Sequence, residues 1–385
     1  METSGFDFWI VLSRENNEDP IHRTLVTWDM PEARRVSILA FHRDSATGAV
    51  RKMCVGSQSP EMDKLYENVQ KQGESVWEAL ARVLQECDPA RIAVDRSVWS
   101  GFCDGLSSTL FEQLKDSIDP CYCARIEDGE DLTVRWLERV TPLEKKIMKC
   151  FCEVTHAIIH YTFSSDFVVP GKTTTTDIEW CMRSIINELG YRYWFGPDVD
   201  LQRRGSSVSR MFDVTIEPGD LIHCDIGING QYVQLHTDMQ WVAYILREGE
   251  KQVPQDLQAL LDCGNRFRQI VMENMHVGKQ GNAVFTAAMR QAKAEGIQPM
   301  LYSHPVGTFG HGAGPTIGLY TNQGFVPGTG ERTIEEDTCF ALELNVYDNI
   351  SCWDGQRVFM YLEENICRAA ENDYIDGHQT KLLLI

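Results

Sequence analysis

Four acidic residues interrupt apolar, strand-like runs of this sequence. They are Asp225 in LIHCDIGI, Asp238 shortly before WVAYIL, Glu343 in FALELNV and Glu363 in FMYLEENI. A carboxylate in the centre of a strand is costly to bury unless it is paired or coordinates a metal ion. One such residue alone is commonly half exposed, but four together with a histidine form the mixed oxygen and nitrogen ligand set that divalent first-row metals take. The set therefore predicts a metal site.

The histidine comes from the stretch SHPVGTFGHGAG, where His304 and His311 stand seven residues apart in a run with four glycines. Glycine allows a close backbone approach that a bulkier residue would obstruct. A second histidine pair, His156 and His160, has helical i, i+4 spacing, but HAIIH lacks the glutamate of HExxH, which excludes zincin chemistry. We interpret that second pair as packed or hydrogen-bonded side chains.

The ordered series Asp, Asp, His, Glu, Glu resembles the M24 metallopeptidases, the group of methionine aminopeptidase, aminopeptidase P and prolidase with the pita-bread fold. The resemblance covers about residues 141–385. The motifs that match are D-x-G at Asp225, an S/T-D pair at Thr237–Asp238, [GS]-H-x-x-G at Ser303–Gly307 with the further His311, a hydrophobic strand ending at Glu343, and an acidic run opened by Glu363. Five ordered matches are far more specific than any one of them.

The resemblance implies a hydrolase that cleaves an amide in the manner of Xaa-Pro aminopeptidases and dipeptidases, with a hydroxide that bridges two divalent metal ions. Manganese is the expected metal, and cobalt, iron and zinc are alternatives. The implied ligands are Asp225, Asp238, His304, Glu343 and Glu363, of which Asp238 and Glu363 would bridge both ions. Glu343 would also shuttle a proton, and His311 would contact the substrate carbonyl or the developing oxyanion.

The sequence departs from the family pattern near the site. Tyr361 stands where many members have an arginine that braces the first aspartate, and the loop Tyr193–Gly205 contains no histidine, although peptidases of the group usually place one there. These departures keep two alternatives open. The first is a non-peptidase metalloenzyme that acts on a specialised small metabolite as a hydrolase, a lyase or dehydratase, or an iron-dependent oxidase. The second is a metal-free binding module.

Three further residues are candidates for substrate contacts. His236 either supports the metal site or faces solvent, Asp198 could deliver a proton to a leaving amine, and Arg203 could bind a substrate carboxylate instead of being an ordinary solvated residue. We expect His223, the neighbour of Cys224, to point away from the site as the alternate residue of its strand. The substrate itself is expected to be a small peptide or an amide-containing small molecule.

The chain is long enough for two domains. A Thr-Pro-Leu-Glu helix start at Thr141 places the boundary just before it. We predict a smaller α/β domain of creatinase type at residues 1–138 and an α+β pita-bread domain at residues 139–385. The family resemblance also suggests a homodimer.

Composition excludes several classes of function. A net charge of −20 without any basic run argues against nucleic-acid binding. The sequence contains neither an apolar segment of membrane-spanning length nor a signal peptide, so we expect a cytoplasmic protein that does not associate with membranes. Its thirteen cysteines are scattered without paired CxxC knuckles, as in a protein with reduced thiols.

Overall fold

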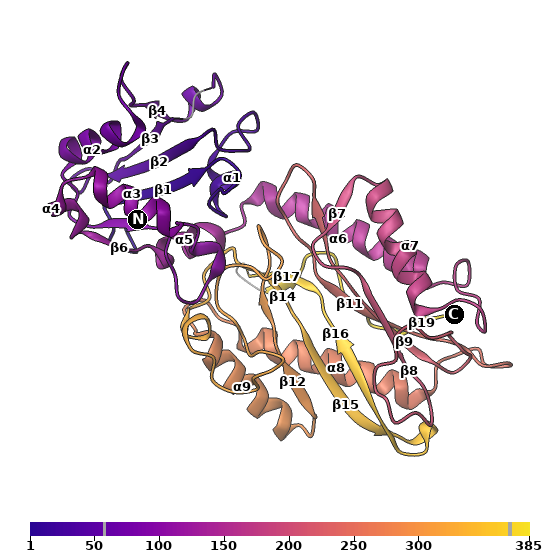
Figure 1. The fold of residues 1–385 in the computed structure, drawn as a ribbon. Coiled ribbons are helices and arrows are strands. Elements are labelled where there is room, and N and C mark those ends of the chain that lie inside the picture. The colour runs from indigo at the N-terminus through magenta and orange to yellow at the C-terminus, as the bar shows by residue number, and fades with distance from the viewer. Residues whose placement is uncertain (57–58, 369–371) are drawn as a thin grey trace. The chain divides into compact units, whose positions relative to one another are not determined.

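The computed structural model describes residues 1–56, 59–368 and 372–385 (Figure 1). It divides into two compact units, Met1–Trp136 and Leu137–Ile385. Within the described residues, no helix combines the length and the hydrophobicity that a membrane span requires. All thirteen cysteines are free thiols.

The first unit is built on a six-stranded mixed sheet with the order β4-β3-β2-β1-β5-β6. Its strands are β1 Phe8–Arg14, β2 Val36–Arg43, β3 Val50–Val55, β4 Glu67–Asn68, β5 Ile92–Val94 and β6 Ile126–Asp128. The helical segments that accompany it are α1 His22–Leu25, η1 Met62–Lys64, α2 Val76–Cys87, η2 Gly101–Cys103, α3 Ser108–Ser117, α4 Pro120–Cys123 and α5 Glu130–Leu137. Helix α2 begins with a capping box formed by Ser75 and Glu78, and it buries a stripe with helical spacing against the sheet: Ala79, Leu80, Val83 and Leu84.

The second unit begins with two helices that cover a four-stranded sheet of order β19-β11-β9-β8. These elements are α6 Pro142–Thr162, α7 Thr175–Glu188, β8 Asp198–Gln202, β9 Leu221–Ile226, β11 Met239–Tyr244 and β19 Leu383–Leu384, with a small pair formed by β7 Tyr191–Tyr193 and β10 Ile228–Gly230. Thr141 caps α6 through a capping box with Glu144, and Pro142 occupies the first helical position, as the sequence predicts.

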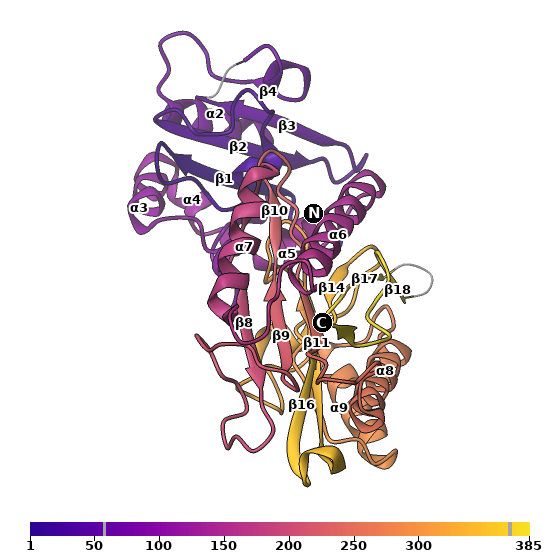
Figure 2. The same ribbon diagram turned by 90° about the vertical axis from the view of Figure 1, so that its right-hand side faces the viewer.

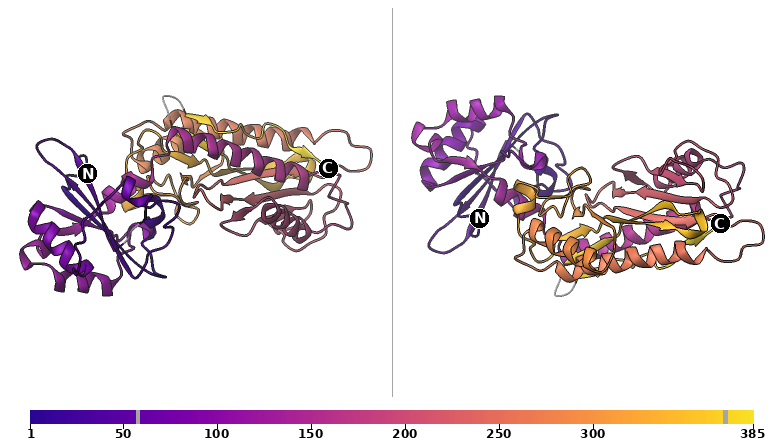
Figure 3. Two further views of the ribbon diagram at one scale, coloured as in Figure 1. Left: turned by 90° about the horizontal axis from the view of Figure 1, so that it is seen from above. Right: turned by 90° about the horizontal axis from the view of Figure 1, so that it is seen from below.

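A second pair of helices covers the remaining strands of this unit. These elements are α8 Gln255–Asn274, α9 Gly281–Ala294, β12 Pro299–Leu301, β13 His304–Pro305, η3 Gly328–Glu331, β14 Cys339–Ala341, β15 Leu344–Ile350, η4 Ser351–Trp353, β16 Gln356–Leu362, β17 Asn365–Arg368 and β18 Asn372–Tyr374. The long helices α6 and α8 run in roughly the same direction as the strands (Figure 3). The duplicated arrangement of two helices and a sheet agrees with the α+β domain that the sequence predicts.

The strands β8, β9 and β11 lie side by side in one sheet (Figure 2). One face packs against α6 and α7 through Ile222, Cys224, Ile226, Met239, Trp241 and Ala243. Because side chains alternate along a strand, the residues between them point to the opposite face. That face holds Asp225 and Asp238, and a backbone bridge between Gln240 and Glu363 joins β11 to the end of β16. The two halves of the unit therefore meet at the polar residues.

Candidate metal centre

Two glutamates of the centre lie in short gaps between consecutive strands, and these gaps lie side by side in the paired strands. Residues 302–303 separate β12 from β13, residues 342–343 separate β14 from β15, and residues 363–364 separate β16 from β17. The buried Ser303 hydroxyl accepts a hydrogen bond from the Glu343 amide and donates one to the Glu343 carbonyl, each at 3.0 Å. These two hydrogen bonds fix the backbone of Glu343 between β14 and β15.

Two aspartates enter from the facing strands. Asp225 lies near the end of β9, in register with Asp198 of β8 on one side and Gln240 of β11 on the other. Asp238 immediately precedes β11, and its backbone is held by the Asn365 side chain. The Asn365 oxygen accepts from the Asp238 amide at 3.2 Å, and its nitrogen donates to the Asp238 carbonyl at 3.1 Å. Asn365 thus ties the β11 side of the centre to β17.

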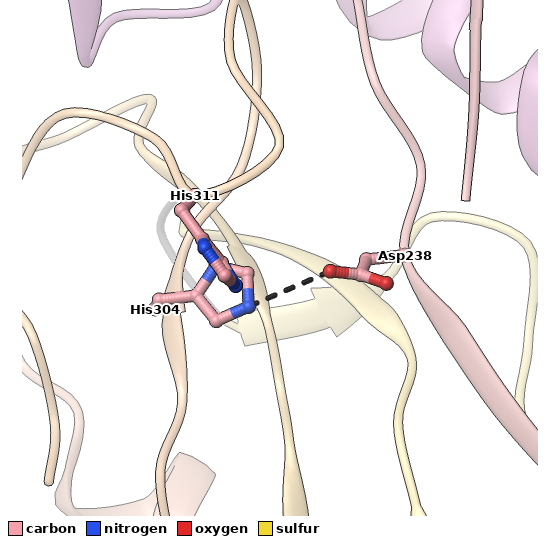
Figure 4. A group of neighbouring side chains, drawn as sticks. All are labelled: Asp238, His304 and His311. Atoms are coloured by element: carbon pink, nitrogen blue, oxygen red, sulfur yellow. Dashed lines mark ion pairs between the residues drawn. The ribbon is translucent and has the colours of Figure 1, made fainter. Parts of the chain in front are cut away.

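His304 completes the group from β13. Its Nε2 atom lies 3.5 Å from Asp238 Oδ2, 3.8 Å from Glu343 Oε2 and 3.7 Å from Glu363 Oε1. Figure 4 shows the ring edge of His304 turned toward Asp238, with His311 beside it. His304 Nδ1 lies 3.0 Å from the Pro305 carbonyl, to which it can only donate. The lone pair of the neutral ring therefore sits on Nε2, toward the carboxylates, as a metal ligand requires.

The donor atoms fit a divalent metal ion. Three groups each place their ligand atoms within 4.8 Å of one another: Asp238, His304 and His311; His304, Glu343 and Glu363; and Asp225, Asp238 and Glu363. Three buried atoms of these residues have no hydrogen-bond partner, namely Asp225 Oδ1, His304 Nε2 and Glu363 Oε1. Buried polar atoms without partners are rare in folded proteins. All three atoms belong to residues of the overlapping groups above, and together they indicate a cation site.

The pKa values of the residues in the centre also indicate a cation site. Burial raises the pKa of Asp225 to about 7. Burial and then the neighbouring carboxylates also raise the pKa values of Asp238, Glu343 and Glu363 well above their usual range. Burial, followed by the nearby His311, lowers the pKa of His304 to about 3. Four carboxylates that repel one another beside a neutral imidazole are stabilised when a cation lies between them.

We expect the stability of the metal-free protein to reveal the cost of burying the Asp225 carboxylate. The folded pKa of Asp225 is about 7 and its ordinary value is 3.8, so folded Asp225 holds a proton that the unfolded chain has released. Its contribution therefore becomes less favourable as the pH rises from about 4 to about 7. The melting temperature of metal-free Asp225→Asn should exceed that of the metal-free parent by a margin that grows over this range. A difference of about 1 kcal/mol corresponds to roughly 2–4 °C. A margin that shrinks with pH would contradict the expectation.

His311 lies at the solvent-accessible side of the centre. Its ring stands edge-on to the His304 ring at 4.5 Å between centroids and to the Trp194 ring at 5.2 Å. Partial burial lowers the pKa of His311. The Trp194 indole donates to the Thr237 carbonyl at 3.0 Å, and a Cβ at Gly310 would lie only 2.4 Å from the indole. Glycine is therefore required at position 310 for Trp194 to lie against the loop that carries both histidines.

The structure places the three candidate substrate-contacting residues differently. His236 is buried, its Nδ1 lies 3.0 Å from the Gly307 carbonyl, and its ring is 6.1 Å from that of Trp194. Asp198 is half exposed beside Asp225 and accepts a hydrogen bond from Arg210 at 3.1 Å. Arg203 is directed elsewhere, because its guanidinium binds both carboxylate oxygens of Asp220, at 2.8 and 2.7 Å. The position of Arg203 lends no support to a role in substrate binding.

The expectation that His223 points away from the site is wrong. His223 is buried on the same face of β9 as Asp225, with Nδ1 3.0 Å from Asp200 and Nε2 3.0 Å from Gln240 Oε1. A period of two along the strand places residues 223 and 225 on one face, so the alternation itself was the signal. The sequence does not reveal the contacts of Gln240 and Asp200, because a polar residue in a strand carries no local mark of its partners. Arg210 lies in the segment between β8 and β9, and nothing in that segment marks its contact with Asp200.

The second histidine pair is hydrogen-bonded and packed, as the sequence predicts. His156 lies 2.9 Å from Asp376 and 3.2 Å from Glu364, and the Trp241 indole donates to Glu364 at 2.5 Å. His160 packs edge-on against the Trp241 ring. The acidic run that begins at Glu363 is therefore divided, with Glu363 in the metal centre and Glu364 on the side of α6.

The model of the family described as Metallopeptidase family M24 matches residues 146–367, which is more than half of the chain. The chain belongs to metallopeptidase family M24. Among curated proteins, none matches the chain. Membership of the M24 family supports a metal-dependent peptidase and makes the protein a metallohydrolase. The divalent ions that M24 enzymes generally use agree with the carboxylate and histidine groups described above.

Solved structures of similar fold extend the comparison to the whole chain. An X-Pro aminopeptidase from Thermotoga maritima MSB8 has 14% identity and a TM-score of 0.68, over 99% of this chain and 98% of that one. An Xaa-Pro dipeptidase from Bacillus anthracis has 14% identity and a TM-score of 0.66, over 100% and 96%. The dipeptidase PepE from Mycobacterium ulcerans has 15% identity and a TM-score of 0.64, over 100% and 94%. At these identities the likeness concerns the fold, and it confirms the pita-bread architecture of this M24 protein.

Proposed function

We propose that this M24 protein is a dinuclear metallopeptidase that cleaves the amide of a small Xaa-Pro peptide, as an aminopeptidase or a dipeptidase. The observation that carries the proposal is the convergence of Asp225, Asp238, His304, Glu343 and Glu363, with unpartnered donor atoms turned toward one another. Manganese is the proposed metal. Similar folds in an X-Pro aminopeptidase and an Xaa-Pro dipeptidase support the substrate class.

The proposed chemistry assigns a role to each side chain. Bound divalent ions would activate a water molecule and polarise the scissile carbonyl. Glu343 Oε2 is turned into the centre 3.8 Å from His304 Nε2, and we assign it the transfer of a proton between the nucleophilic water and the leaving amine. His311, at the accessible side, would donate a hydrogen bond to the substrate carbonyl oxygen as charge develops there.

The remaining site residues have supporting roles in this proposal. His236 and Trp194 would form a wall of the substrate site beside His311. Asp198, next to Asp225 and half exposed, would contact the substrate and deliver a proton to the leaving amine. We also propose a creatinase-type domain at residues 1–138, a pita-bread domain at residues 139–385, a homodimeric assembly and a cytoplasmic location.

Metal content and peptide turnover test the proposal together. The purified protein would be stripped with a chelator, reloaded separately with Mn²⁺, Co²⁺, Fe²⁺ or Zn²⁺, and measured for bound metal by mass spectrometry. We expect two ions per chain and cleavage of Xaa-Pro dipeptides or of longer peptides with proline in the second position. A chain that holds no stoichiometric metal after reloading would contradict the proposal.

One observation supports a second candidate function. The loop Tyr193–Gly205 contributes Trp194 rather than a histidine beside His311, so the substrate would meet an apolar ring there. Such a wall would suit a specialised small metabolite in a hydrolytic, dehydrating or oxidative reaction at the same centre. Two bound ions without cleavage of proline-containing or methionine-initiated peptides, together with turnover of such a metabolite, would favour this function.

A further inference from the structure

Gln240 is a buried, uncharged residue in contact with two of the proposed metal ligands. Its Nε2 atom donates to Glu343 Oε1 at 2.6 Å and to Glu363 Oε2 at 2.9 Å. We propose that Gln240 is a positioning residue that orients both glutamates for metal binding, an inference that rests on the proposed metal site. Its action would pass through the glutamates, since they, and not the amide, would touch the ions.

The division of carboxylate oxygens supports this role. Each glutamate turns one oxygen to the Gln240 amide and the other into the centre, where Glu343 Oε2 lies 3.8 Å and Glu363 Oε1 lies 3.7 Å from His304 Nε2. Glu363 Oε1 is buried and has no hydrogen-bond partner. One primary amide has two N–H donors, and both are used here. Gln240 thereby sets which oxygen of each glutamate remains available for a cation.

The backbone of Gln240 holds the same partner. The backbone N–H of Gln240 donates to the backbone carbonyl of Glu363 at 3.2 Å. The backbone N–H of Glu363 donates to the backbone carbonyl of Gln240 at 3.3 Å. Gln240 also lies in register with Asp225 of β9. This residue therefore stands between a ligand on β9 and a ligand at the end of β16, at the join between the two halves of the unit.

A hydrogen-bonded chain fixes the orientation of the Gln240 amide. Its Oε1 faces His223 Nε2 at 3.0 Å, His223 Nδ1 faces Asp200 at 3.0 Å, and Asp200 accepts from Arg210 Nε at 2.7 Å. A reversed amide would turn its oxygen toward two carboxylate oxygens, which accept hydrogen bonds and cannot donate them when ionised. Gln240, His223 and Asp200 are all buried, so solvent cannot replace these partners. This hydrogen-bonded chain therefore links the Arg210 guanidinium, outside the metal centre, to the two glutamates within it.

Loss of both donors is expected to weaken metal binding. Hydrogen bonds to ligand carboxylates restrict their rotation, and removal of such partners typically costs about 10–100-fold in metal affinity. The test replaces Gln240 by methionine, which has similar length and no donor. Titration of the metal-free protein with Co²⁺ by calorimetry should show a roughly 10–100-fold weaker affinity, and the visible spectrum of the Co²⁺ form should change because the ligand geometry changes.

Gln202 offers a control on strand β8 of the same sheet. It is equally buried, donates to the Phe359 carbonyl at 2.7 Å and accepts from the Phe359 amide at 2.9 Å, away from the metal ligands. Gln202→Met removes a buried amide that makes two side-chain hydrogen bonds, whereas that of Gln240 makes three. It should therefore cost stability while leaving the Co²⁺ affinity and spectrum unchanged. Gln240→Asn is a second variant, polar but too short to span both glutamates, and it should weaken Co²⁺ binding like Gln240→Met.

The outcomes separate this inference from the proposed function. If folded Gln240→Met or Gln240→Asn binds Co²⁺ with the parent affinity and spectrum, Gln240 does not position the ligands. If Gln202→Met weakens binding as much as Gln240→Met, the effect is one of general stability and the inference is overturned. A parent chain that does not bind Co²⁺ at all would overturn the metal site itself and this inference with it.

Discussion

Replacement of Glu343 by alanine is expected to lower kcat/KM by about 10³-fold or more on whichever peptide the enzyme cleaves best. The side chain has two proposed tasks, since it contributes a ligand oxygen and also transfers a proton. Its carboxylate lies among Asp225, Asp238 and Glu363, where burial raises its pKa well above the ordinary range. A raised pKa brings a carboxylate closer to the working pH of a general base. Steady-state kinetics with saturating Mn²⁺ would measure the loss.

Glu343→Gln separates the two tasks. The amide keeps the shape of the side chain but cannot accept a proton as a carboxylate does, so turnover should fall even where metal remains bound. Glu179 of α7 provides the control, because it is also largely buried and accepts from the Val199 amide at 3.2 Å, outside the centre. Glu179→Gln should retain most of the activity. Full activity of Glu343→Ala in metal-loaded protein would refute the assigned role.

The parts of the site that can be predicted from the sequence are those with a strong local signal. A single charged residue in an apolar strand is commonly half exposed, but its recurrence at Asp225, Asp238, Glu343 and Glu363, together with a histidine motif, is enough to single out the set. The start of α6 is equally local, since Thr141, Pro142 and Glu144 define it within four residues. The fold class follows from the family resemblance, and the structural comparisons confirm it.

The unpredicted part of the site depends on contacts between strands. Gln240 acquires its role only because the register of β11 places it beside Asp225 and because a bridge brings Glu363 to it. A sequence does not display strand register, so the chain from Arg210 through His223 to Gln240 could not be assembled. The structure also shows Arg210 5.4 Å from the ring of Tyr361, the position at which the family often has its own arginine. The Arg210 guanidinium therefore lies near Tyr361, although Arg210 comes from a different segment of the chain than the arginine that the family often has.

The identity of the metal is also outside the reach of sequence. Carboxylates and imidazole bind manganese, iron, cobalt and zinc, and selection among them depends on geometry and supply. The five ligands therefore define a class of ions. Hydrogen bonds to the ligand oxygens, such as those from Gln240, are one of the means by which a protein tunes affinity within that class.

The two histidines of SHPVGTFGHGAG are expected to have different roles, so their replacement by alanine should have different effects. We expect His304→Ala to lose bound metal and turnover together, since its Nε2 is the only nitrogen within 4 Å of three carboxylates among the described ion pairs. We expect His311→Ala to keep its metal and to lose about 10²–10³-fold in kcat, the usual cost of one oxyanion donor. Metal analysis and kinetics on the same preparations would measure both.

The geometry also defines the competing possibility. His311 shares one group of potential ligand atoms with Asp238 and His304, so it could in principle bind an ion directly. Its position argues for substrate contact: it is accessible to solvent and leans edge-on against both His304 and Trp194, whereas His304 is buried with Nδ1 held by the Pro305 carbonyl. A His311→Ala protein that binds one ion fewer than its parent would contradict the division and make His311 a ligand. Retained metal with a lower kcat would place it at the reacting carbonyl.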